Sequence, residues 1–185
     1  MKSNTSRGFT LTELLIVIAI IGLLAGIILA AISKAREKAQ IAKTVIEVKE
    51  LSKSVYQYYV DTGINPQCAF PCSAINDPLM NSLGVSGWAG PYGVMYGKVH
   101  PWGGAFGPTD DYDIDGGGND YVVDLNDDRP GMGGGDNGGR IPTNVLLEID
   151  RILDDGDLST GNARANGLDF GGGTVLGEMM IKMTW

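Results

Sequence analysis

The pattern of hydrophobic and polar positions divides the chain into a strongly apolar N-terminal segment and a more polar remainder. Residues 14–32 form an apolar run of 19 residues without a charge. A helix of that length spans about 28 Å, close to the ~30 Å hydrocarbon core of a bilayer, and the run lacks the polar face of a soluble core helix. We therefore predict a transmembrane helix at about 14–32. A secretory signal peptide is the alternative, because Lys2 and Arg7 supply a basic start.

After this run, the period of the pattern changes. Apolar residues recur at steps of three and four, which predicts one buried stripe along a helix: Ile41, Val45, Val48, Leu51, Val55, Tyr58 and Tyr59. No proline interrupts residues 9–60, so the pattern predicts one continuous helix, with Gly63 as its C-terminal cap.

The remaining residues predict short elements separated by glycine-rich and aspartate-rich loops. We expect a short capped helix at 77–84, a strand at 121–125, an amphipathic helix at 143–153 capped by Thr143 or Asn144, and a half-buried terminal strand at 175–185. The predicted class is α+β: a long N-terminal helix, transmembrane in its first half, packed on a small antiparallel β-sheet head.

Charge is distributed unevenly between the two parts. Residues 1–60 carry eight Lys/Arg and four Asp/Glu, a net of +4, and residues 61–185 carry six and 18, a net of −12. An acidic head repels nucleic acid, so we expect no nucleic-acid partner. His100 is the single histidine, which excludes a Cys/His zinc cluster and leaves no Ser/His/Asp set. We expect no enzyme; a hydrolase with paired carboxylates is the alternative, and a raised pKa in a deep pocket would mark it.

One acidic stretch resembles the opening of a calcium loop. Asp111, Asp113, Asp115 and the following glycine fit D-x-D-x-D-G, in which alternate carboxylates and a glycine turn can wrap a calcium ion. The twelfth position is valine instead of glutamate, so Asp120 or Asp124 would have to close a different cage. We predict calcium as a cofactor here, with a solvated acidic loop as the alternative. Residues 154–157 (Asp-Asp-Gly-Asp) are a second candidate segment.

The residues before the apolar run resemble a processing signal. Residues 7–13 read Arg-Gly-Phe-Thr-Leu-Thr-Glu, similar to the motif of type IV prepilins and type II secretion pseudopilins. The resemblance implies cleavage between Gly8 and Phe9, N-methylation of Phe9, and pairing of Glu13 with the N-terminal amine of a neighbouring subunit. The chain would then comprise a leader at 1–8, a stem helix at 9–60 and an extracytoplasmic head at 61–185.

Electrostatics supports this role for Glu13. A lone buried carboxylate and a lone buried ammonium are each expensive in a membrane, and pairing lowers the cost of both. The alternative is an interfacial carboxylate among the headgroups. The sequence departs from the family pattern at Thr12, where an aliphatic residue is preferred, and at Ala30, where many pilins carry a kinking proline.

Two later segments strengthen the resemblance. Trp-Ala-Gly-Pro-Tyr at 88–92 and His-Pro-Trp-Gly at 100–103 are similar to loops of the major pseudopilin, with His100 in place of an aspartate. The alternative is two turns anchored by buried tryptophans. In an extracytoplasmic compartment, Cys68 and Cys72 are predicted to form a disulfide that closes a short loop, and a redox pair is the alternative.

The resemblance as a whole implies a structural subunit of a type IV pilin-like filament. It would be processed by prepilin peptidase, held in the bacterial inner membrane and polymerised with copies of itself into a helical filament by assembly machinery. The filament would be periplasmic or on the cell surface. The alternatives are the major pseudopilin of a type II secretion system and a minor, calcium-dependent adhesive pilin.

Overall fold

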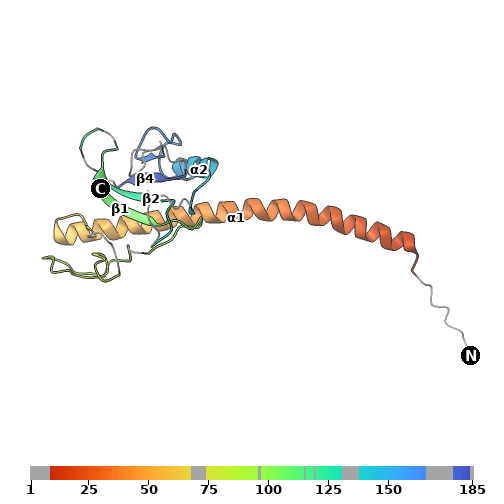
Figure 1. Cartoon of the computed structure of the whole chain (residues 1–185), viewed down its shortest axis with the longest axis horizontal. Coiled ribbons are helices and arrows are strands. Elements are labelled where there is room, and N and C mark those ends of the chain that lie inside the picture. Colours follow the sequence, from red (N-terminus) through yellow and green to blue (C-terminus); the bar gives the residue numbers. More distant parts are fainter. Residues whose placement is uncertain are drawn as a thin grey trace, which may run out of the picture. The chain divides into compact units, whose positions relative to one another are not determined.

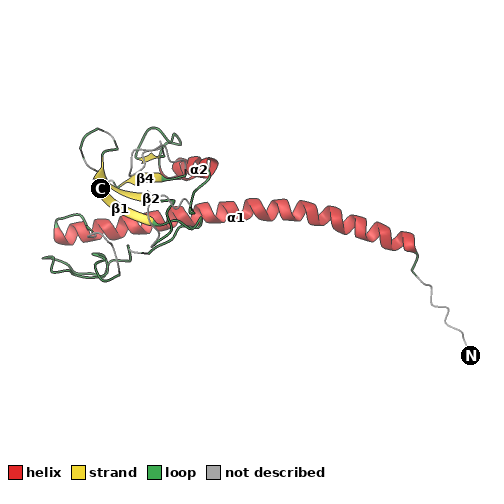
Figure 2. Cartoon of the chain, viewed as in Figure 1, coloured by secondary structure: helices red, strands yellow, loops and turns green. Residues whose placement is uncertain are grey.

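The computed structural model describes residues 9–67, 74–95, 97–114, 116–118, 120–130, 138–165 and 177–183, with backbone only at 109–112. Figure 2 shows the helices, a small sheet and long stretches of loop. The elements are α1 (Leu11–Thr62), β1 (Phe106–Tyr112), β2 (Asp120–Leu125), α2 (Thr143–Leu153), β3 (Ala163–Arg164) and β4 (Met179–Lys182), labelled in part in Figure 1. The chain divides into two compact units, Met1–Gln40 and Ile41–Trp185.

The described part of the first unit is the start of α1. Its aliphatic side chains from Leu14 to Ile32 are about half exposed or more, since no other element of that unit covers them. The helix holds an 18-residue window with a mean hydropathy of 3.2, and none of this window is buried by the part of the chain that the structure describes. By length and composition this helix can cross a membrane, and the predicted transmembrane segment falls within it.

In the second unit, the later part of α1 carries the predicted apolar stripe. Ile41, Val45, Val48, Leu51, Val55 and Tyr58 are all buried, and Thr44 lies buried among them. Tyr59, in contrast, is 38% exposed, because it lies one position off the stripe. The helix ends at Thr62. Gly63 follows at a φ of 73° and donates its N–H to the carbonyl of Tyr59, as expected for a glycine cap.

The sheet is antiparallel throughout, in the order β1-β2-β4-β3. Alternation along β2 and β4 sends one set of side chains into the main core and the other to the opposite face. The main core joins the α1 stripe to residues from β2, β4 and α2, among them Tyr121, Val123, Leu125, Val145, Leu146, Ile149, Met179 and Ile181. Val122 and Met180 form a smaller cluster with Ile114 on the other face.

The structure confirms the predicted strand at 121–125 and the helix at 143–153, and it corrects other details. Residues 77–84 form turns instead of a capped helix. The Asp77 side chain accepts hydrogen bonds from the N–H groups of Leu79 (2.9 Å) and Met95 (2.7 Å), so it bridges two loop segments. Neither Thr143 nor Asn144 caps α2. The N-cap is Pro142, without a side-chain hydrogen bond.

Two strands were not predicted, and one was predicted too long. β1 contains Pro108 and has a register shift between Thr109 and Tyr112, so its sequence does not alternate cleanly. β3 has only two residues. β4 covers Met179–Lys182 of the predicted 175–185, and residues 175, 176, 184 and 185 lie outside the described residues.

Candidate functional site

The N-terminal end of α1 is closed by a reciprocal pair of hydrogen bonds between Thr10 and Glu13. The Thr10 hydroxyl oxygen accepts the Glu13 backbone N–H (3.2 Å). Glu13 Oε2 accepts the Thr10 backbone N–H (2.9 Å) and the Thr10 hydroxyl (2.8 Å). This arrangement is a capping box, which satisfies N–H groups that a helix start leaves without intrahelical partners.

Sequence reasoning missed the capping box, although the signal was present. Thr-x-x-Glu directly before an apolar run is its sequence signature. Both residues lie after the predicted cleavage point, so a mature chain beginning at Phe9 keeps the box. Phe9 is 81% exposed and Gly8 lies outside the described residues. The predicted pairing of Glu13 with a neighbouring amine stays a prediction.

The predicted calcium loop is described only in part. The carboxylate of Asp113 accepts the N–H of Gly116 (2.6 Å) within its own turn. Asp120 pairs with Lys182 Nζ at 2.5 Å and accepts the N–H of Ile114 (2.9 Å). Asp120 is therefore neutralised by a cation of β4. Asp115 and the side chain of Asp111 lie outside the described residues, so calcium at this loop stays a prediction.

Asp124 lies apart from that turn, buried on β2. Its side chain is 1% exposed and accepts one hydrogen bond, from Asn126 Nδ2 at 3.1 Å. Burial, and then the nearby Glu178 carboxylate, raise the pKa of Asp124 well above its usual value. A carboxyl group in this environment favours its protonated form, which is a poor calcium ligand.

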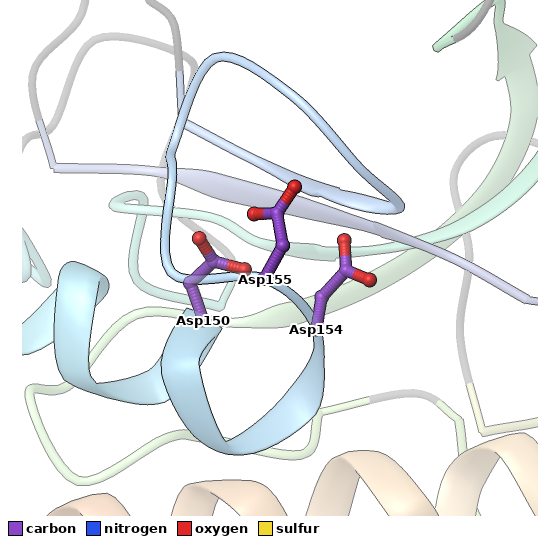
Figure 3. A group of neighbouring side chains, drawn as sticks. All are labelled: Asp150, Asp154 and Asp155. Carbon is purple, nitrogen blue, oxygen red and sulfur yellow. The ribbon is translucent and has the colours of Figure 1, made fainter.

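A second acidic cluster brings together Asp150, Asp154 and Asp155, at the C-terminal end of α2 and the loop that follows. One carboxylate oxygen from each residue lies within 4.8 Å of the others. Figure 3 shows the three side chains rising from the end of the helix into the same space. The segment 154–157 was predicted as a calcium candidate. The contribution of Asp150 from the helix was not, because only the fold brings it to the loop.

Asp150 differs from its two neighbours in the cluster. Its side chain is fully buried. The backbone N–H of Gly156 interacts with its carboxylate, but no donor of the described residues meets standard hydrogen-bond geometry at either oxygen. Burial, and then the charges of Asp155 and Asp154, raise the pKa of Asp150 to about 6.

The loop after α2 is organised around the other two carboxylates. Asp154 accepts the backbone N–H groups of Asn162 and Ala163. Asp155 accepts the Asp157 N–H (2.9 Å) and the Thr160 hydroxyl (2.8 Å). These hydrogen bonds fix the loop between α2 and β3 in place around the cluster.

The aromatic loops have structural roles in the head. The indole of Trp88 packs against the core and donates to the Pro78 carbonyl at 3.0 Å. His100 is 1% exposed, with Nε2 2.9 Å from the Asn126 carbonyl oxygen, and its burial lowers its pKa. Both segments therefore anchor turns. Cys68 and Cys72 lie outside the described residues, and their disulfide stays a prediction.

Two surface cavities of the head lie along α1. The first is lined by residues 50, 51, 53, 54, 57, 92–94 and 98, and the second by residues 58, 59, 63–65, 67, 78, 83 and 85. Asp124 and Asp150, whose pKa values are raised, line neither of them. A carboxyl group with a raised pKa in a pocket, the feature expected of a paired-carboxylate hydrolase, is therefore not found at these two cavities.

A long N-terminal helix with an exposed apolar start, packed further along on a small antiparallel sheet, defines the α+β pilin class of fold. The family described as the prokaryotic N-terminal methylation motif matches residues 3–29, which include Gly8, Phe9 and Glu13. The comparison with solved structures finds no match.

Relatives extend this match into the head. The fimbrial protein EcpC of Eikenella corrodens is 36% identical over 58% of this chain and 71% of its own length. The type II secretion system core protein G of Xanthomonas campestris is 30% identical over 67% of this chain and 81% of its own. The type IV major pilin protein PilE1 of Neisseria gonorrhoeae is 35% identical over 45% of this chain, but the match spans only 42% of that pilin.

The chain belongs to the family of type IV pilins and type II secretion pseudopilins. The names of these relatives denote pilins, a fimbrial protein and a secretion core protein, and none denotes an enzyme. The apolar helix and the family together support membrane anchoring before assembly.

Proposed function

We propose that this protein is the structural subunit of a type IV pilin-like filament, polymerised through the first half of α1. The main support is the apolar surface of residues 14–32, which begins directly after Glu13 and which the described residues leave uncovered. In a bilayer, lipid covers this surface. Once a subunit leaves the bilayer, the same surface needs the helices of other subunits, because exposing it to water costs roughly 25 cal/mol per Å².

Glu13 and the amine of a processed Phe9 would set the register between neighbours. The capping box holds Glu13 at the helix start, next to the new N-terminus. Apolar packing alone allows neighbouring helices to slide, whereas a buried ion pair is favourable only where its two charges meet. This proposal requires prepilin peptidase to remove residues 1–8 on the cytoplasmic side and so create the amine.

The second candidate is the major pseudopilin of a type II secretion system. The match to a secretion core protein over 81% of its length favours it. Both candidates share the anchoring and packing mechanism, and they differ in what the filament does.

Deleting the gene and restoring it on a plasmid separates the two functions. Surface filaments are imaged and secreted enzymes are assayed in the same strains. Loss of surface fibres with normal secretion selects the pilus, and loss of secretion with normal fibres selects the pseudopilus. Normal fibres and normal secretion in the deletion strain would contradict both.

Processing is tested on the mature protein. Intact-mass analysis of the chain purified from membranes or filaments should give a chain that starts at Phe9 and carries one extra methyl group. A mass that still includes residues 1–8 would show that the leader is retained and that no new amine forms.

A further inference from the structure

A polar cavity of the head lies between α1 and the loop that leads towards β1. Its volume is about 370 Å³, and its described lining comprises residues 50, 51, 53, 54, 57, 92–94 and 98. Lys53 and Gln57 of α1 and Lys98 of the loop bring two cations and an amide to this lining, against the single carboxylate of Glu50. The cavity is therefore slightly basic, whereas residues 61–185 carry a net charge of −12.

The loop is held against the helix, so the cavity is preformed. The Ser54 hydroxyl donates to the Tyr92 carbonyl at 3.0 Å. A Cβ at Gly93 would lie 2.9 Å from Ser54 Oγ, so a larger residue would push the loop away from the helix. At the other end of the loop, the Lys98 carbonyl accepts the Phe106 N–H of β1 at 3.0 Å. A preformed site loses little free energy to ordering when a partner binds.

Neither lysine of the cavity has a partner of opposite charge in the described part of the chain. The described ion pairs join other residues: Lys43 with Glu47, Arg140 with Asp127, Arg151 with Glu148 and Lys182 with Asp120. Lys98 Nζ lies 6.0 Å from the centre of the Phe106 ring, a cation–π contact that leaves its N–H donors available. Lys53 is exposed. Both ammonium groups can therefore donate to carboxylates of another molecule.

Carboxylates crowd the turn between β1 and β2. Residues 110–115 contain four aspartates. The Asp113 side chain is exposed and accepts the N–H of Gly116 at 2.6 Å, within the turn itself. In Figure 1 the turn projects from the ends of β1 and β2, on the side of the sheet away from α1. The turn of one chain therefore cannot reach the cavity of the same chain, which lies along α1.

We propose that the cavity beside α1 of one subunit receives the acidic β1–β2 turn of a second copy, whose carboxylates bind Lys53 and Lys98. The proposal rests on the filament function and adds a contact between heads to the packing of the stems. The turn and the cavity are different surfaces of one head, so their contact is heterologous. Such a contact repeats from copy to copy, and it builds an open helical filament when its rotation does not close.

Charge favours this occupant over the other segments. Opposite charges steer association and fix the register of two surfaces, whereas an apolar segment would cover both lysines without pairing them. The acidic loop at 154–157 is less suited to the cavity. Asp154 accepts the Ala163 N–H of β3 and Asp155 accepts the Thr160 hydroxyl, so these carboxylates already fix their own loop.

Cysteine cross-linking in filaments tests the contact. Gln57→Cys places a thiol in the cavity wall and Asp113→Cys places one in the turn, and the double variant keeps both lysines and three aspartates of the turn. On oxidation, its filaments should give a ladder of covalent dimers, trimers and longer products, because a heterologous contact links each subunit to two neighbours. The two single variants should give no ladder, and they control for any reaction of Cys68 and Cys72.

A charge swap tests the chemistry of the contact. Lys53→Glu and Asp113→Lys should each lower the filament yield at least about twofold, the size expected for exposed ion pairs. Subunit levels in the membrane, checked by immunoblot, should not change. The combined variant should recover most of the yield, since it puts opposite charges back in contact. Lys49→Glu is the matched control. Lys49 is exposed on the same helix outside the cavity lining, so its reversal should leave the yield unchanged.

Two results would overturn the proposal. One is filaments of the double cysteine variant that give no more cross-linked product than the single variants. The other is a charge swap that recovers no more yield than either reversal alone. Both results would leave the filament function standing, because filaments still form. An absence of filaments from the wild-type chain would instead contradict the filament function itself, and this contact with it.

Discussion

At the residue scale, the acidic residues inside the head lie in different electrostatic surroundings, and they affect the stability of the head differently. Asp120 has a lysine partner, Asp124 is buried beside other carboxylates, and Asp150 is buried beside two acids of a loop. The surroundings of Asp124 and Asp150 raise the pKa of both carboxyl groups. The stability of the head should therefore depend on Asp150 in a way that changes with pH.

In calcium-free buffer, Asp150→Asn should remove one step from the pH dependence of stability. The folded-state pKa of Asp150, about 6, exceeds its usual value of 3.8. Between these values the folded chain holds a proton that the unfolded chain has lost, so the free energy of unfolding falls as pH rises from about 4 to 6 and stays lowered above. The asparagine variant cannot lose this proton, so it should gain stability relative to the wild type as pH rises.

The measurement is denaturant unfolding of the full chain in detergent with chelator, at pH 4, 5, 6 and 7.5. Fluorescence of the partly buried Trp88 and Trp102 provides the signal. The test is how the difference in the free energy of unfolding between variant and wild type changes with pH. Its value at a single pH does not decide, because a buried amide adds a cost that is the same at every pH. Glu148→Gln is the control. A pH-independent difference for Asp150→Asn would contradict the raised pKa.

At the element scale, periodic segments were predictable and irregular ones were not. The α1 stripe, the Gly63 cap, β2 and the bounds of α2 follow from local periodicity and capping chemistry. β1 contains a proline and a register shift, and β3 has two residues that pair with β4. Their strand character depends on partners distant in sequence, which no local pattern contains.

The same distinction applies to the candidate sites. Glu13 and the cleavage motif lie in one short stretch of the chain, so they can be recognised from the sequence alone. The cluster at Asp150, Asp154 and Asp155 was predicted only in its loop portion. Asp150 occurs within an amphipathic helix, where an acidic residue is expected to be solvated, and burial is known only once α2 is placed in the fold.

The buried stripe of α1 should stabilise the head far more than the rest of that helix. Leu51→Ala should lower the free energy of unfolding by about 2–5 kcal/mol, because Leu51 is 2% exposed and its loss leaves a cavity. Ile46→Ala on the same helix, where Ile46 is 56% exposed, should change it by less than about 0.5 kcal/mol in the isolated chain. Denaturant unfolding measures both. Equal effects would contradict the packing of α1 into the core.

At the scale of the whole molecule, α1 serves both parts of the chain. Its second half is an integral part of the core of the head, and its first half has an apolar surface that only lipid or other helices can cover. Residues 9–60, which remain once residues 1–8 are removed as proposed, carry six Lys/Arg and four Asp/Glu, a net of +2, whereas residues 61–185 carry a net of −12. In the proposed filament, these opposite signs favour contacts between the stem of one subunit and the head of another.

The pairing of Glu13 with a neighbouring amine is the most specific part of the assembly proposal. Glu13→Gln keeps the size of the side chain and an oxygen that can accept the Thr10 N–H, but it removes the charge. Thr10→Val is the matched control, because it removes the hydroxyl of the capping box and keeps the charge of Glu13. A weakened cap costs about 1 kcal/mol and should leave assembly largely intact.

The most direct measurement is the yield and length of filaments from cells expressing Glu13→Gln, counted by electron microscopy, with the amount of subunit in the membrane checked by immunoblot. The account predicts normal membrane levels, with filaments absent or reduced to a small fraction of the wild-type yield, while Thr10→Val still assembles. Filaments of wild-type yield and length from Glu13→Gln would contradict it.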